Sequence, residues 1–257
     1  MDKKQREDRR HQEDLALTRA LLWVAAAVVL EALLVFLNRF YINYHLDNDA
    51  IDLMLLLHSV LQGVRIGGLA LAVIALVWAV LQARKGGRAV LPLLICLGAG
   101  ALAICSHVAM KYKGTGVSML FWLVVAWAAR AVVYYLYQKE FFLGLTAAGM
   151  SVLGLWFVRY GGGVSYEVAL LLAGILLVLA VTLWLKKKGG ALPFPKESPI
   201  QFLPADCSYA ATLISCLGSL AVLAAAIVLG ATVAYYLIFA MLAWIFALFV
   251  YYTVKMM

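Results

Sequence analysis

Residues 207–255 read CSYAATLISCLGSLAVLAAAIVLGATVAYYLIFAMLAWIFALFVYYTVK, and their only charged side chain is Lys255. A helix needs about 20 apolar residues to cross the ~30 Å hydrocarbon core of a bilayer. Two such runs stand on either side of Gly230, so we expect two spanning helices joined by a tight antiparallel hairpin. A β-barrel strand would instead alternate apolar and polar residues over about ten positions. The stretch therefore predicts membrane-spanning helices.

The same pattern continues through the rest of the chain. Hydrophobic residues make up 66% of its 257 residues and charged residues only 13%, too few to cover a soluble domain of this length. The sequence thus predicts an all-α, polytopic integral membrane bundle of about eight transmembrane helices. Residues 52–62 either lie in the membrane interface or extend the second span. The expected spans are 15–40, 53–83, 89–110, 117–138, 141–158, 168–185, 207–229 and 231–255.

The positive charges lie mainly in the short segments between the spans. A net charge of +8 would suit a nucleic-acid partner, but this placement is the topology signal of membrane proteins, and we expect no nucleic acid. Fifteen Lys and Arg residues lie at one set of span ends and four at the other, while Arg65 and Arg130 fall within spans. The richer ends face the cytoplasm. Both termini are therefore expected there, in a plasma membrane.

The chain is expected to consist of a short charged segment and two membrane units. Residues 1–14 carry dense charge of both signs, which is typical of a cytoplasmic segment rather than a signal peptide. Residues 15–140 form the first four-helix unit and residues 141–257 the second. Within the second unit, the Pro-rich loop 186–206 is expected to be cytoplasmic and extended.

Short matches recur in the same order in both halves, at offsets of 103 to 120 residues. Four spans return a chain to the side where it started, so two four-span copies would have the same orientation. Parallel repeats of this kind are a known transporter architecture. Chance similarity of apolar helices that end in tyrosine is the alternative. The matching segments are 96–98 with 216–218, 126–135 with 243–252, 85–92 with 188–193, and 33–40 with 153–160.

Glu31 and Arg130 are the candidate functional pair, because charges inside spans are costly. Glu31 follows Arg19 by twelve residues and Arg130 precedes Lys139 by nine, which places them ~18 Å and ~14 Å from the same boundary. The repeat aligns Glu31 with Ser151, so the acid belongs to one copy only. Two interpretations remain open: a binding site for a proton or a cationic solute, or a structural pair that docks two helices. The glutamate in the first of four spans is similar to the layout of small drug-efflux proteins, although no further motif is shared.

A second candidate site is a polar stretch on the side opposite the termini. Carboxylates and imidazoles can hold metal ions, but the spacing matches no calcium loop and no H-E-x-x-H motif, so we predict no metal and no cofactor. A solvated loop is the simpler interpretation. The residues of this possible outer-face polar site are His45, Asp47, Asp49, Asp52, His58 and His107.

The sequence carries no catalytic signature. Gly149-Met150-Ser151 begins like a nucleophile elbow, but Leu153 replaces the last glycine. The four cysteines are best explained as packing residues, because no C-x-x-C occurs. We therefore expect a non-enzymatic membrane protein. It is either a transporter or channel for a small solute or ion that uses Glu31 and Arg130, or a structural or accessory subunit with a membrane-protein partner.

Overall fold

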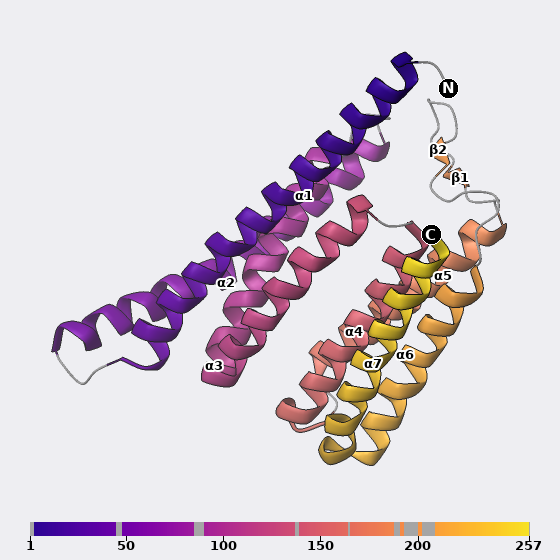
Figure 1. Ribbon diagram of the computed structural model, residues 1–257. Coiled ribbons are helices and arrows are strands. Elements are labelled where there is room, and N and C mark those ends of the chain that lie inside the picture. The colour runs from indigo at the N-terminus through magenta and orange to yellow at the C-terminus, as the bar shows by residue number, and fades with distance from the viewer. Residues whose placement is uncertain are drawn as a thin grey trace. The chain divides into compact units, whose positions relative to one another are not determined.

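The computed structural model describes residues 3–44, 48–84, 90–136, 139–163, 165–187, 191–192, 200–201 and 209–256. Nearly all of them are helical, as Figure 1 shows. Two strands, β1 (Ala191–Leu192) and β2 (Ile200–Gln201), form a short antiparallel pair. The helical elements are α1 (Lys3–Leu37), the π-helical turn η1 (Asn38–Ile42), α2 (Asn48–Arg84), α3 (Val90–Leu136), α4 (Lys139–Gly161), α5 (Tyr166–Lys187), α6 (Tyr209–Leu229) and α7 (Ala231–Met256).

Seven of the described helices are long and apolar enough to cross a membrane. A helix satisfies every backbone N–H and C=O within one segment, which is required where no water can reach. The predicted all-helical class is thereby confirmed, and the helices have the length and apolar character that crossing a membrane requires. The predicted second span, 53–83, lies within α2, which begins at Asn48 and includes residues 52–62 without a break.

Helix α3 accounts for the difference between seven helices and the eight expected spans. Its 47 residues are interrupted at Lys113, where φ is 46° and ψ is −127°, so it consists of two limbs. A Cβ placed on Gly116 would lie 2.5 Å from the carbonyl oxygen of Val108. Residues eight apart in a continuous helix are separated by about 12 Å, so the chain must turn back here. The predicted loop at 111–116 is thus reduced to one non-helical residue, and only glycine fits at Gly116.

Two compact units make up the chain. The C-terminal unit comprises Met1–Leu21 and Arg130–Met257, and the N-terminal unit comprises Leu22–Ala129. Each unit is described by itself below.

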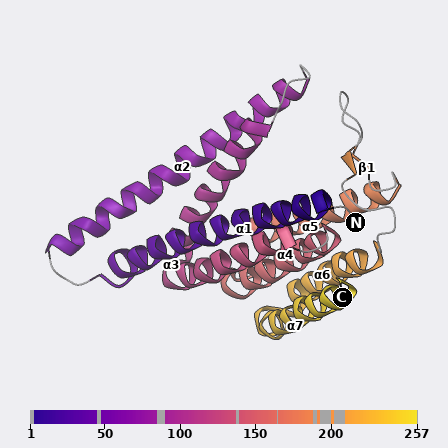
Figure 2. The same cartoon turned by 45° about the horizontal axis from the view of Figure 1, so that its top comes forward.

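In the C-terminal unit, α4 packs against α5, α6 and α7 (Figure 1, Figure 2). One face of α4 is fully buried through Phe141, Ala148, Ser151 and Leu155, spaced by seven, three and four residues. Close helix contact depends on small residues, because association within a bilayer relies on van der Waals packing. Gly154 shows this, since a Cβ there would lie 2.8 Å from Cδ1 of Leu223.

Turns in the C-terminal unit are made by glycine. Gly162 and Gly163, after α4, have φ angles of 76° and 122°, and Gly230, between α6 and α7, has a φ of 88°. Such positive angles cost glycine little. The Gly230 N–H donates to the carbonyl oxygen of Ala226 over 2.9 Å at the end of α6, and the Gly230 carbonyl oxygen accepts from the Ala234 N–H over 3.1 Å at the start of α7. The predicted hairpin at Gly230 is confirmed. Of the loop predicted at 186–206, residues 186 and 187 belong to α5, and the other described residues form β1 and β2.

In the N-terminal unit, α2 contacts the first limb of α3 through small residues. A Cβ on Gly68 would lie 3.0 Å from the carbonyl oxygen of Ala99 and 3.2 Å from Cβ of Ala103. Helix α1 reaches the second limb of α3 through Trp23 and Trp127, whose rings meet edge to face with centroids 5.0 Å apart.

Candidate functional site

Glu31 lies on α1, eight residues beyond Trp23, or about 12 Å further along the helix. Its oxygen Oε1 is buried and has no hydrogen-bond partner among the residues that the structure describes. The neighbouring Ala27 is buried, and Leu30 and Leu34 are partly buried. An ionised carboxylate in apolar surroundings is unfavourable unless a charge or a donor compensates it. Glu31 is therefore a charge that lacks a described partner for one of its oxygens.

Arg130 lies on the second limb of α3 and is partly buried. Its guanidinium carbon sits 4.4 Å from the ring centroid of Phe142, in the first turn of α4. A cation over an aromatic face gains about 0.5–2 kcal/mol, more when it is desolvated. Arg130 thus has an aromatic partner that the sequence did not single out. Glu31 belongs to the other unit, and its pairing with Arg130 stays a prediction.

Ser151 occupies the position that the repeat aligns with Glu31. It is completely buried on α4, and its hydroxyl donates to the carbonyl oxygen of Ser219 on α6 over 3.3 Å. A hydroxyl bonded to a backbone carbonyl is a common way to satisfy a polar group within a helical membrane bundle. The two aligned positions therefore differ in chemistry: one is neutral and hydrogen-bonded, and the other is an acid with a buried oxygen.

His58, a residue of the predicted outer polar site, contacts Tyr41. The Tyr41 hydroxyl and His58 Nδ1 are 3.0 Å apart, and their rings stack with centroids at 6.2 Å and an interplanar angle of 17°. Tyr41 belongs to the π-helical turn η1, which changes the direction of its side chain relative to α1. Nothing in the sequence pattern signals this contact, because it depends on that turn.

The other residues of this predicted site are spread over several elements. Asp49 and Asp52 are exposed on α2, and His107 is partly buried on the first limb of α3. His45 and Asp47 lie outside the described residues. Within the described part of the chain, no group of three His, Cys, Asp or Glu residues could hold a metal ion.

A polar seam that the sequence did not reveal runs along one end of the C-terminal unit. The Glu140 side chain is only 5% exposed, and its Oε2 lies 3.2 Å from Nζ of Lys255. Thr212 donates to the Glu140 carbonyl oxygen over 3.3 Å, and Trp244 Nε1 donates to Ser215 over 3.2 Å. The only hint was that Glu140 and Lys255 both lie near the expected cytoplasmic ends of their helices.

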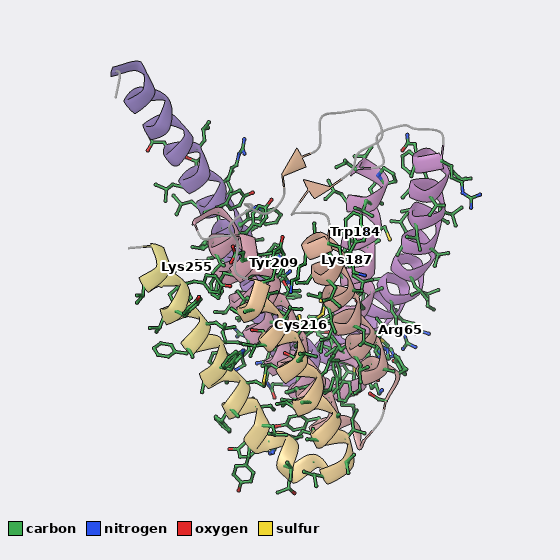
Figure 3. The ribbon with its side chains drawn as sticks, turned by 90° about the vertical axis from the view of Figure 1, so that its right-hand side faces the viewer. Arg65, Trp184, Lys187, Tyr209, Cys216 and Lys255 are labelled. Atoms are coloured by element: carbon green, nitrogen blue, oxygen red, sulfur yellow. The ribbon has the colours of Figure 1, made fainter. Side chains whose placement is uncertain are left out.

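Figure 3 shows Lys187, Tyr209 and Lys255 at this same end of the C-terminal unit, with Cys216 further along α6. Cys216 is buried, and Cys96 and Cys105 of the N-terminal unit are partly buried; all three are free thiols. Arg65 is exposed on α2 (Figure 3).

In chemical terms, the C-terminal unit pairs the Ser151 hydroxyl and the Glu140 carboxylate, while its Ser165 Oγ and Ser219 Oγ are buried without a hydrogen-bond partner among the described residues. The N-terminal unit supplies a carboxylate able to take up a proton or a cation. No protein-family model matches this chain, and no curated protein or solved structure is significantly similar to it.

Proposed function

We propose that this protein crosses the membrane eight times as two parallel four-helix units, and that a proton or a small cationic solute permeates by way of Glu31. The single observation that carries the proposal is the buried, unpartnered Oε1 of Glu31 among the described residues. Intramembrane carboxylates are rare and commonly lie on ion or substrate pathways.

Eight crossings are supported by the reversal within α3. A straight helix of 47 residues would be about 70 Å long, more than twice the ~30 Å hydrocarbon core. The limbs 90–112 and 114–136 each have about the length that one crossing needs. Crossings on both limbs also bring the termini to the same side.

The duplication is supported by local geometry at residues 36–40 and 156–160, one segment in each unit. The aromatic rings at the first and last positions are 4.7 Å apart and tilted by 47° in the first segment, and 4.9 Å apart and tilted by 42° in the second. In each segment the arginine at the fourth position lies over the last ring, at 5.5 Å and 5.3 Å. The side chains of the aligned segments therefore adopt matching arrangements.

Orientation follows from the charges at the unit ends. Lys187 and Lys255 lie at one end of the C-terminal unit, whereas Arg159 lies in the last turn of α4 at the other. The end richer in cations is assigned to the cytoplasm of a plasma membrane. Both termini are then cytoplasmic.

In this proposal, Glu31 acts by exchanging the group that neutralises its negative charge. In a region without water, its carboxylate must be neutralised by a proton, a solute cation or the Arg130 guanidinium. Exchange among these partners couples solute binding to proton release. A group that holds one partner permanently could not carry out such exchange, and the free acceptor Oε1 leaves room for it.

The proposal can be tested by measuring proton flux in liposomes that contain the purified protein. A membrane potential is imposed, and a pH-sensitive dye inside the liposomes reports the flux. Wild-type protein should dissipate a proton gradient, or exchange protons for an added organic cation, faster than empty liposomes. Glu31→Gln removes the exchangeable charge and should abolish this flux, while Ser151→Ala, at the aligned position, should retain it. Equal flux in Glu31→Gln and wild type at equal folded yield would refute the role of Glu31.

The second candidate is a structural or accessory subunit, and the sparse packing of the N-terminal unit favours it. Only 11% of the apolar window of α1 and of α2 is buried within the chain, against 56% for α4. A partner's intramembrane donor would then satisfy Glu31. Combining Glu31→Gln with Arg130→Gln separates the cases: recovery of folded yield by the double variant, with no flux in the parent, indicates an architectural pair.

A further inference from the structure

Arg159 lies in the last turn of α4, at the end of its unit opposite Lys187 and Lys255. It follows Lys139, the first residue of α4, by 20 residues, or about 30 Å along the helix. This length equals the thickness of the hydrocarbon core. If α4 crosses the membrane as proposed, the guanidinium lies at the level of the lipid headgroups.

Two tyrosine rings from different helices hold this guanidinium. Its carbon is 4.1 Å from the centroid of Tyr235 on α7 and 5.3 Å from that of Tyr160 on α4. Tyr235 meets Phe239 edge to face at 5.0 Å, and Tyr160 packs on Trp156 at 4.9 Å. The rings are themselves supported, so the arginine is oriented before any ligand arrives.

The guanidinium edge remains available for an anion. Arg159 is partly buried, and within the described part of the chain no carboxylate pairs with it. Stacking uses the faces of a planar guanidinium and leaves its fork of N–H donors, which matches the paired oxygens of a phosphate. At headgroup level, phosphate is the abundant anion.

We propose that Arg159, braced by Tyr160 and Tyr235, is a binding site for a phosphate group, as carried by a phospholipid headgroup. The inference rests on α4 being a membrane span, and it is independent of any role of Glu31. A phosphate seated there would fix the end of α4 to α7 and anchor the C-terminal unit in the far leaflet.

Arg39 provides a matched control within the same chain. It lies over Phe40 at 5.5 Å, in the segment aligned with Arg159, and it is exposed. The position aligned with Tyr235 is Ser118, whose hydroxyl donates to the Gly114 carbonyl oxygen. Arg39 therefore carries the same positive charge as Arg159 but lacks a counterpart of the Tyr235 ring.

Native mass spectrometry of the full-length protein in detergent tests the site by titration with phosphatidylglycerol. Glucosyl diacylglycerol with the same acyl chains serves as the lipid without phosphate. Arg159→Gln removes the charge-assisted pair of hydrogen bonds between the guanidinium and the phosphate. We expect it to weaken the affinity of the tightest phosphatidylglycerol-binding step about tenfold. Arg159→Lys, which keeps the charge but not the fork, and Tyr235→Leu, which keeps Arg159, should also weaken it. Arg39→Gln should stay within about twofold of wild type, because it removes an unbraced charge.

Competition with inorganic phosphate identifies the source of the ligand. Retention of phosphatidylglycerol against excess phosphate supports a headgroup site, and its displacement supports the same site with a soluble phosphate. Equal binding of the two lipids, or wild-type affinity in Arg159→Gln, would overturn the proposal. Full retention in Arg159→Lys would also overturn it, since charge alone would then account for the binding.

Discussion

The two units differ at the positions that the repeat aligns, Glu31 and Ser151, although each unit contains some buried polar atoms without a described hydrogen-bond partner. In the C-terminal unit, Ser151 is buried against a backbone carbonyl and Glu140 is matched by Lys255. In the N-terminal unit, Glu31 keeps a buried oxygen for which the described residues supply no donor. Within a bilayer, unsatisfied polar groups are unfavourable, so they persist where they have a use. We therefore propose that Glu31 is the reactive group and that the hydrogen-bonded Ser151 belongs to the supporting structure.

The helices of the two units also differ in how much of their apolar surface is buried. Helix α4 is surrounded by three helices and buries Phe141 and Leu155 completely. Helices α1 and α2 leave most of their apolar side chains open to lipid or to a partner.

Moving the acid from one unit to the other should have the largest effect. Ser151→Glu places a carboxylate at a fully buried position of the C-terminal unit, and an uncompensated buried charge costs about 3–5 kcal/mol or more. We expect loss of folded, monodisperse protein, measured by size exclusion and by unfolding in a denaturing detergent. Ser151→Ala removes one hydrogen bond and should cost only about 1 kcal/mol.

Glu31→Ser is the reciprocal change, and it should leave stability unchanged or raised. A large loss of stability in Glu31→Ser, together with tolerance of Ser151→Glu, would reverse the roles that we assign to the two residues.

Helix contact in the N-terminal unit should be sensitive at Gly68 and tolerant at Gly67. Gly68→Val would press side-chain atoms against the backbone of Ala99, where a Cβ already lies 3.0 Å from the carbonyl oxygen. Overpacking of this kind costs about 1–3 kcal/mol. A Cβ at Gly67 meets nothing within 4 Å, so Gly67→Val should be nearly neutral in the same unfolding measurement. Similar losses in both variants would argue against the α2–α3 contact.

Removal of Lys255 should produce the smallest of these effects. Its side chain is 30% exposed, so water screens part of its attraction to Glu140, and we expect Lys255→Met to cost about 1–2 kcal/mol. Glu140→Gln should cost less, because Lys255 can turn toward water whereas Glu140 cannot. A double-mutant cycle on unfolding free energies measures the coupling; a coupling of zero would mean that the seam does not stabilise the bundle.

The length of the apolar runs predicted where the helices lie, but it did not predict which helices contact one another. The span expected at 141–158 lies within α4, and the hairpin at Gly230 was clear from one glycine between two apolar runs. The polar residues at 111–116 suggested a loop. In the structure, the chain reverses its direction there with only Lys113 departing from helical backbone angles. Sequence spacing specifies where a helix begins and ends, but all-round apolar helices carry no stripe that selects a neighbour.

The candidate site shows the same limit. Glu31 and Arg130 were identified from the cost of a charge within a span, which is a property of one helix. Phe142 beneath Arg130 and Tyr235 over Arg159 come from neighbouring helices, and neither contact follows from spacing along the chain. Tyr41 reaches His58 through a π-helical turn, for which the sequence has no recognisable signature.

Cysteine accessibility in intact cells tests most directly whether the two units cross the membrane in the same direction. In a background with the native cysteines changed to serine, Thr115→Cys and Gly161→Cys probe the two turns, and Arg84→Cys and Lys187→Cys probe the opposite helix ends. We predict that an impermeant maleimide labels positions 115 and 161 and spares positions 84 and 187 until the cells are opened. Labelling of only one residue of the pair 115 and 161 would contradict the two parallel four-helix units.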